Sequence, residues 1–285
     1  MKKGYIYSIL SAILFGSAGL VIKFAYVGGI DSISLLTLQY IIAVVIMFIV
    51  LYIMDKKALK VNRNVLLHCA ILGIVGNTFM TIFYYLAFKY LPVAMVAILL
   101  YTYPIMVFLY SFIFEKEKVD LKKFIALLMA FSGCVLALGL IGGKTSYSKV
   151  GIIYGVLSAL FYAFMNIYSE KKLAKVDSLT INFYSTLFSL ISLIIYRVPV
   201  FVLKGEVSIS LIGYTTILAV LCEILPLTLL YAAIKRIGSL KVSIIGNLEI
   251  PTAMILSYIF LHETITFSQL IGAVFVFYAV YKIRS

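Results

Sequence analysis

The stretch Gly4–Ala12, GYIYSILSA, returns 147 residues later as Gly151–Ala159, GIIYGVLSA, with six of nine positions identical. A second stretch, Ser111–Val119 (SFIFEKEKV), returns 146 residues later as Ser257–Ile265 (SYIFLHETI), with four of nine positions identical. Because the two offsets agree to one residue across more than a hundred positions, they indicate that one structural unit occurs twice in the chain.

The two copies are strongly apolar. Of the 285 residues, 64% are apolar and 12% are charged, a composition that excludes an ordinary soluble domain. A membrane-spanning helix needs about 20 mostly apolar residues. We expect ten such spans, at 4–25, 33–54, 66–88, 93–114, 121–141, 150–170, 178–197, 208–234, 240–261 and 266–283. The fold class predicted is an all-α integral membrane protein.

Each copy contains five of these spans, so the second copy enters the bilayer from the side opposite the first. We therefore expect two inverted five-helix repeats, at residues 1–141 and 150–285, joined by a polar linker at 142–149. Inverted repeats of this kind are typical of secondary transporters, in which one repeat rocks against the other around a site near the bilayer midplane.

The net charge of +13 is distributed unevenly over the expected loops. Eighteen of the 24 Lys and Arg residues fall on one face, Lys57 and Lys172 among them, and six fall on the other, Lys144 and Lys204 among them. The positive-inside rule then predicts a cell-membrane protein with both termini cytoplasmic. The expected partners of the basic loops are anionic lipid headgroups, not nucleic acid. The sequence does not decide whether the protein is a monomer or a homodimer.

Two acidic residues lie near the middle of expected spans, Glu223 in the eighth and Glu249 in the ninth. A charged side chain at the bilayer centre costs roughly 2.5–3.5 kcal/mol, so such residues normally face inward and serve a function. No Lys or Arg lies at a comparable depth. We predict that both acids bind substrate or a coupling proton; the alternative is that they are protonated and only hydrogen-bond between helices.

Other polar residues at membrane depth extend these two positions. At the 146-residue offset, Glu223 corresponds to Asn77 and Glu249 to Tyr103. Helical spacing adds further candidates for substrate binding or coupling, namely Thr81, Tyr84, Tyr162, Asn166, Tyr231 and Asn247. We assign a separate stripe on the seventh span to interhelical hydrogen bonding; its members are Asn182, Ser185, Ser189 and Ser192.

Three prolines lie close to the same positions. Pro104, Pro226 and Pro251 are expected to kink their helices and to free the carbonyls four residues earlier, on Leu100, Cys222 and Asn247. Free carbonyls beside a carboxylate form an electronegative pocket suited to a proton or an organic cation. The tyrosines expected nearby offer cation–π faces; they are Tyr84, Tyr101, Tyr103, Tyr162 and Tyr231.

No pattern for enzymatic chemistry accompanies these features. His68 and His262 lie at span ends without metal-ligand spacing, and the three cysteines have none either. We therefore expect no catalytic residues, no metal and no cofactor. The sequence also lacks GxxxxGK[ST], which excludes an ATP-driven pump on this chain.

The whole chain resembles the drug/metabolite transporter superfamily, and in particular its EamA-type members with two EamA repeats. The resemblance rests on the small-residue first helices (GYIYSILSAILFGSAG and GIIYGVLSALFYAF), on the proline-bearing fourth helix of each repeat, and on Glu117 and Glu263 after those helices. The family usually has glycine before each of these glutamates, where this chain has Lys116 and His262. The resemblance implies a cavity formed by the first, third, fourth, sixth, eighth and ninth helices.

The function predicted is secondary active transport of a small amphipathic metabolite, such as an amino acid, an amine or a cationic drug, with export coupled to a proton gradient. Uptake or facilitated exchange of a choline-like amine is the alternative within the same class. The alternative of another class is a non-transporting membrane scaffold or an intramembrane enzyme. The sequence shows no arrangement of catalytic residues that would support such an enzyme.

Overall fold

The computed structural model describes residues 2–25, 30–116, 120–138, 147–200, 208–262 and 264–284, and the regular elements among them are all helical. Glu117, Glu263, Lys144, Lys204 and most of the expected linker lie outside the described residues. The helices of the first repeat are α1 (Lys2–Ala25), α2 (Ser32–Met54), η2 (Lys56–Leu59), α3 (Arg63–Ile71), η3 (Leu72–Thr78), α4 (Phe79–Phe88), α5 (Val93–Leu100), α6 (Tyr103–Phe114) and α7 (Leu121–Ala137). Those of the second are α8 (Lys149–Leu173), α9 (Ser178–Tyr196), α11 (Ile209–Ala219), η4 (Val220–Ile224), α12 (Leu225–Ile237), α13 (Ser239–Gly246), α14 (Glu249–Leu261) and α15 (Phe267–Arg284).

Every expected span coincides with a helix or with a run of consecutive helices. Among the described residues, eight of these segments are long and apolar enough to cross a membrane. The other two, α7 with 17 described residues and α15 with 18, are shorter. The structure thus shows a multi-pass arrangement of apolar helices, while the count of ten crossings stays a prediction.

The third helix of each repeat contains a π-helical segment. In the first repeat η3 separates α3 from α4, and in the second η4 separates α11 from α12. The two segments end at Thr78 and Ile224, which are 146 residues apart. In η3 the carbonyl of Gly73 accepts hydrogen bonds from two hydroxyls, those of Thr78 and Ser189, both at 3.0 Å. π-Helical segments are rare and occur frequently at functional sites.

The fourth helix of each repeat is interrupted at matching places. Tyr101 and Thr102 form a turn between α5 and α6, and Asn247 and Leu248 form the corresponding turn between α13 and α14. Discontinuous helices at membrane depth expose backbone groups and are tolerated where the surrounding protein or a cavity receives those groups.

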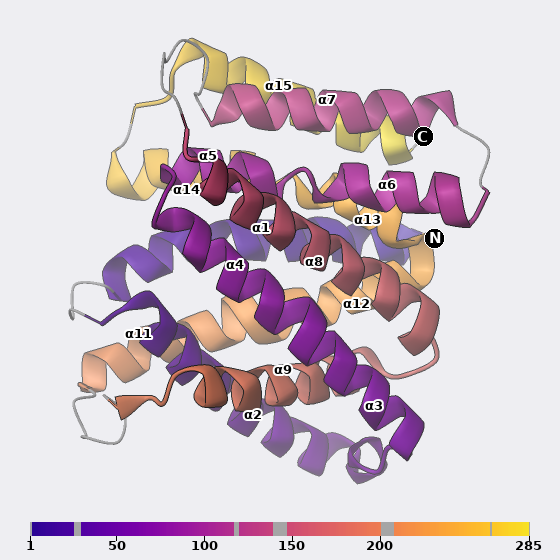
Figure 1. Ribbon diagram of the computed structural model, residues 1–285, viewed down its shortest axis with the longest axis vertical. Helices are drawn as coiled ribbons and strands as arrows, with labels where there is room; N and C mark the ends of the chain where they lie inside the picture. The colour runs from indigo at the N-terminus through magenta and orange to yellow at the C-terminus, as the bar shows by residue number, and fades with distance from the viewer. Residues whose placement is uncertain are drawn as a thin grey trace.

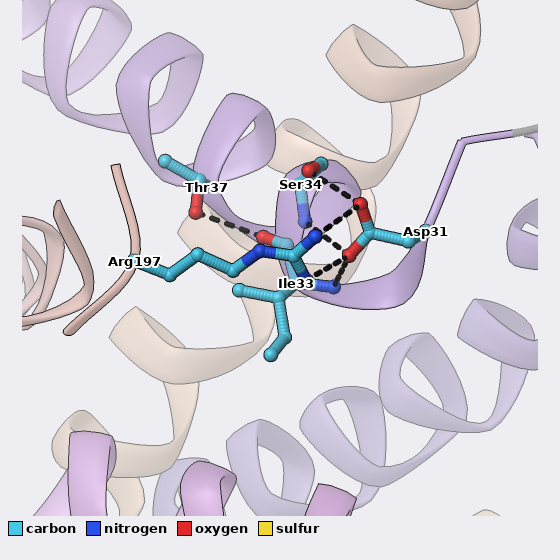
Figure 2. A network of polar contacts seen from close by, with 5 residues as sticks. All are labelled: Asp31, Ile33, Ser34, Thr37 and Arg197. Carbon is cyan, nitrogen blue, oxygen red and sulfur yellow. Dashed lines mark hydrogen bonds and ion pairs between the residues drawn. The ribbon is translucent and has the colours of Figure 1, made fainter. Parts of the chain in front are cut away.

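The N-caps of the helices also repeat at an offset of 146. Asp31 caps α2 and Asp177 caps α9, each by accepting two backbone N–H groups of the first turn. Such caps contribute about 1 kcal/mol each. Asp31 has a further partner, because Arg197 at the end of α9 donates to its two carboxylate oxygens at 2.8 and 3.4 Å (Figure 2).

Packing between the repeats follows the same symmetry. The first helix of each repeat packs against the third and fourth helices of the other: α1 contacts α12 and α14, while α8 contacts α4, α5 and α6. The pair α7–α15 lies side by side at one end of the molecule and the pair α2–α9 lies at the other (Figure 1). Sites between the third and fourth helices of each repeat are therefore enclosed by the first helices.

Glycine lets α7 and α15 approach until their backbones touch. A Cβ placed on Gly133 would meet the carbonyl oxygen of Gly272 at 2.7 Å, and a Cβ on Gly272 would overlap backbone atoms of Ala137 and Gly133. Gly133 also lies against Val276, whereas Ala137, four residues later on α7, lies against Gly272, four residues earlier on α15. The two helices are therefore antiparallel. Small residues allow such close contact in membranes, where lipid supplies no hydrophobic drive for association.

The two residues that replace the family's usual glycines have left-handed backbones. Lys116, after α6, has φ 53°, and His262, after α14, has φ 54°. They are 146 residues apart, and they are the non-glycine residues with positive φ in the described chain. The chain thus keeps the conformation that glycine adopts readily, at the cost of crowding its Cβ atoms.

Candidate functional site

Glu249 lines a cavity of about 440 Å3. It is the first residue of α14 and directly follows the interruption in the ninth span. The cavity is bounded by α1, α4, the α5–α6 turn, α7, α14 and the start of α15. The interruption in the ninth span thus places an acid at the wall of a cavity between the repeats.

The surroundings of Glu249 combine aromatic and small residues. Tyr84 and Tyr101 line the same cavity as the Glu249 carboxylate. Gly16 of α1 lies directly against α14, because a Cβ there would meet the Glu249 carbonyl oxygen at 2.7 Å. No Lys or Arg is among the described residues that line the cavity. An acid with tyrosines and no cationic neighbour favours a positively charged group.

Glu223 lies in a different environment, within η4, and it is 5% exposed. The hydroxyl of Thr186 on α9 donates to the Glu223 carboxylate at 3.2 Å. The amide of Asn182, one turn earlier on α9, donates to the carbonyls of Glu223 and Ile224 at 3.5 and 3.1 Å. The polar stripe on the seventh span therefore serves the acid and its irregular backbone. The expected interhelical hydrogen bonding of this stripe is confirmed for Asn182 and Ser189.

A matching pair of residues occupies the same place in the first repeat. Asn77 corresponds to Glu223 and lies in η3, and Tyr40 on α2 corresponds to Thr186. The hydroxyl of Tyr40 donates to the Asn77 carbonyl oxygen at 3.4 Å. The amide nitrogen of Asn77 is buried and has no hydrogen-bond partner among the described residues. The two repeats thus present a neutral amide and an acid in equivalent surroundings.

The other predicted residues lie in several places. Tyr103 stacks near Tyr162 with ring centroids 4.3 Å apart and donates to the Ser243 carbonyl at 3.1 Å. Asn166 donates to the Tyr162 carbonyl at 2.9 Å, and its own carbonyl oxygen has no partner in the described chain. Thr81 lines a separate pocket of about 40 Å3, away from Glu249. Of the predicted tyrosines, Tyr84 and Tyr101 line the Glu249 cavity, and Tyr231 packs in an apolar cluster.

The predicted role of the prolines needs one correction. Pro104 and Pro226 lie in the first turn of new helices, and Pro251 follows the interruption before α14. The Asn247 carbonyl is not free, because the Ile250 N–H donates to it at 3.2 Å. The Asn247 side chain is occupied as well, since Cys134 donates to it at 3.3 Å. The turn before α14 thus satisfies the Asn247 carbonyl, which an unbroken kinked helix would leave unpaired.

Sequence reasoning missed three residues of these sites: Tyr40, Asn182 as a partner of the η4 carbonyls, and Thr186. The 146-residue offset could have found one of them, because Tyr40 corresponds to Thr186 in the other repeat. Once Thr186 is known to contact Glu223, Tyr40 is expected at the equivalent position. Among the described residues no group of three His, Cys, Asp or Glu side chains could hold a metal ion.

Comparison with known proteins identifies the family. The sequence profile of the EamA-like transporter family matches residues 2–139 and again residues 149–285. The chain belongs to this family. An uncharacterized transporter of Archaeoglobus fulgidus is 28% identical over 95% of this chain and 93% of its own length. An uncharacterized transporter of Clostridium kluyveri is 23% identical over 97% of this chain and 91% of its own.

A solved crystal structure shares the fold. It superposes with a TM-score of 0.79 over 99% of this chain and 96% of its own, at 16% sequence identity. The expected resemblance to EamA-type proteins is thus confirmed, and with it a transporter function within a multi-pass membrane protein. The match of one family profile to both halves agrees with the repeat read from Gly4–Ala12 and Gly151–Ala159.

Proposed function

We propose that this EamA-like transporter moves a small amine, a zwitterionic amino acid or a cationic drug by alternating access, with Glu249 as the substrate-binding carboxylate. The observation that carries the proposal is the cavity of about 440 Å3, which holds Glu249, Tyr84 and Tyr101 and no described Lys or Arg. A cavity of this size accommodates a small organic molecule. An ammonium group would pair with the carboxylate while the tyrosine faces cover its apolar part.

Glu223 is proposed as the proton-coupling residue. It does not line the Glu249 cavity, and it receives a hydrogen bond from Thr186 within packed helices. Burial in a low-dielectric environment disfavours an isolated ionised carboxylate, so a proton is the ligand that suits this position best. In this proposal export is driven by protons that enter as substrate leaves.

The topology proposed is ten crossings as two inverted repeats, with both termini cytoplasmic. The antiparallel packing of α7 against α15 supports the inversion, since these are equivalent helices of the two copies. Lys2 and Lys282 line one cavity, which agrees with termini on the same face. Cysteines at Lys57 and Lys172 should react with an impermeant reagent only from the cytoplasmic side, and a cysteine at Lys149 only from outside. Labelling of Lys57 and Lys149 positions from one side would refute this topology.

A thermal-unfolding screen on the purified protein tests the substrate class. Amines, zwitterionic amino acids, dicarboxylates and phosphorylated sugars are added separately to the wild type and to Glu249→Gln. A ligand at a hundred times its Kd stabilises the folded protein by about 2.7 kcal/mol. We expect amines or amino acids to raise the unfolding temperature of the wild type and to lose most of that effect in Glu249→Gln.

The best ligand is then tested for transport in proteoliposomes. Ser257→Ala, which changes another residue of the same cavity without removing charge, serves as the matched control and should keep binding. Stabilisation by dicarboxylates or phosphorylated sugars that survives in Glu249→Gln would overturn the charge argument. Equal transport by Glu249→Gln and the wild type would remove Glu249 from the substrate site.

A further inference from the structure

A second cavity, of about 600 Å3, lies at the beginnings of α1, α7 and α13 and the end of α15. It shares no lining residue with the Glu249 cavity. Five lysines line it, and the single acid among the lining residues is Asp120; the lysines are Lys2, Lys122, Lys123, Lys241 and Lys282. A concave surface with charges of mostly one sign focuses its field and attracts an ion of the opposite sign.

The acid in this cavity already has a structural role. The Asp120 carboxylate caps α7 by accepting the Lys122 N–H at 2.9 Å. The described lining residues thus combine five lysines with one carboxylate, which is engaged in the cap. An anion bound among the lysines would relieve the repulsion between them.

The cavity is built by segments far apart in the sequence. Tyr5 of α1 accepts a hydrogen bond from the Lys241 ammonium of α13 at 3.1 Å and donates to the Ile283 carbonyl of α15 at 3.4 Å. Three apolar side chains, Ile6, Ile9 and Ile283, line the same space. The cavity thus places ammonium groups and a hydroxyl directly beside an apolar wall.

The other repeat shows that the fold does not require these lysines. At the 146-residue offset Lys122 and Lys123 correspond to Ser268 and Gln269, and Lys241 and Lys282 correspond to Met95 and Leu136. Of the five, Lys2 alone has a basic counterpart, Lys149, at the 147-residue offset of the first helices. The equivalent positions of the repeat therefore carry no basic cluster.

We propose that this cavity binds the phosphate of an anionic phospholipid, with the headgroup against the lysines and the first part of an acyl chain against the isoleucines. The phosphate chemistry could equally come from a soluble phosphate, but the apolar wall has a use only for a ligand with a hydrocarbon portion. Basic pockets between membrane helices bind anionic headgroups by this combination of charge and shape.

Native mass spectrometry of the full-length protein in detergent tests the proposal. Phosphatidylglycerol and phosphatidylcholine with identical acyl chains are titrated against the wild type and against a Lys2→Gln, Lys122→Gln, Lys241→Gln triple variant. Each lysine near an anionic headgroup contributes a factor of roughly five, so phosphatidylglycerol affinity should fall about a hundredfold in the triple variant. Phosphatidylcholine binding should change little in either protein.

Two further proteins complete the design. A Lys56→Gln, Lys57→Gln, Lys60→Gln variant removes three exposed lysines elsewhere in the chain and should keep the wild-type preference. A Lys2→Gln, Lys122→Gln variant changes only exposed residues, so it keeps the test valid if the triple variant folds poorly. Equal losses in the surface-lysine and cavity variants would overturn the proposal, as would equal affinity for the two lipids. Displacement of phosphatidylglycerol by inorganic phosphate alone would also overturn it, in favour of a soluble phosphate.

Discussion

The Thr186 hydroxyl on α9 donates to the Glu223 carboxylate in η4 at 3.2 Å, and the equivalent residues of the first repeat, Tyr40 and Asn77, are joined at 3.4 Å. One contact between the second and third helices of a repeat is thus made twice, with an acid in one copy and an amide in the other. The packing can therefore form around a neutral side chain. Because the charge is not needed for this contact, its presence in the second copy points to a role in transport.

Glu223→Gln should fold normally and lose concentrative transport driven by a pH gradient, because glutamine still accepts a hydrogen bond from Thr186 but cannot bind and release a proton. Counterflow exchange of substrate without a gradient should continue. The measurement compares gradient-driven accumulation with exchange in proteoliposomes. Glu115→Gln, which removes an acid paired with Lys171 at a helix end, is the control and should accumulate substrate normally. Accumulation by Glu223→Gln equal to that of the wild type would make the residue structural and leave Glu249 as the candidate for coupling.

Gly272→Ala should destabilise the protein, because the added methyl would overlap backbone atoms of Ala137 and Gly133, which cannot move without separating α7 from α15. Overpacking of this kind costs about 1–3 kcal/mol. Gly213→Ala is the matched control, since its Cβ would meet no atom within 4 Å. It should be neutral or gain up to about 1 kcal/mol from helix propensity. Unfolding temperatures in one detergent compare the two variants; equal values would show that the close approach is not tight in solution.

Lys116→Gly and His262→Gly should each stabilise the protein. The left-handed backbone at these positions costs a residue with a Cβ about 1–2 kcal/mol, whereas glycine adopts it freely. Glycine loses more freedom on folding, which offsets about 0.5–1 kcal/mol of that gain. The net expectation is a rise of a few tenths to about 1 kcal/mol in the free energy of unfolding. Lys116→Ala, which keeps the Cβ, should give no such rise, and a matching rise in that variant would remove backbone strain as the cause.

Arg197→Gln should lower stability at neutral pH and lose this effect in acid. Burial acts to raise the pKa of Asp31, but hydrogen bonds from Ser34 and the charge of Arg197 outweigh it, so the pKa lies below the ordinary value (Figure 2). A lowered pKa contributes stability above the unfolded value of about 3.9, and this is lost as the pH falls through the folded value. Since both side chains are about half exposed (47% and 51%), the loss at neutral pH should stay below about 1 kcal/mol. Unfolding curves at several pH values and salt concentrations check this, and a difference independent of pH would contradict it.

Much of the fold could be predicted because membrane helices and repeats leave strong signals. The apolar spans were enough to place the long helical segments within a few residues, but they predicted neither the short helix η2 nor the breaks between α5 and α6 and between α13 and α14. The π-helical segments could not be predicted, since they depend on which hydroxyls and amides on α9 reach the carbonyls of η3 and η4. That information lies in tertiary packing and not in the local sequence of either segment.

The site was predicted in part for a related reason. Both acids were predicted from the free-energy cost of placing a charged side chain in hydrocarbon. That prediction assigned Glu223 and Glu249 to one polar cavity. The structure puts Glu249 on a cavity wall and Glu223 between packed helices. Depth along a span can be read from hydropathy, whereas the direction of a side chain depends on the helix phase, which η4 and the α13–α14 turn both change.

The backbone contact between α7 and α15 also limits how the two halves can move. Gly133 and Gly272 hold the halves together at one edge, and sliding there would drive backbone atoms into one another. The opposite edge ends at an exposed ion pair between Asp31 and Arg197. A rotation whose axis runs close to α7 and α15 satisfies both conditions, with displacement growing toward α2 and α9. On such an axis a small rotation would open or close the cavity at Glu249, and the longest travel would fall on α2 and on α9, whose Thr186 contacts Glu223.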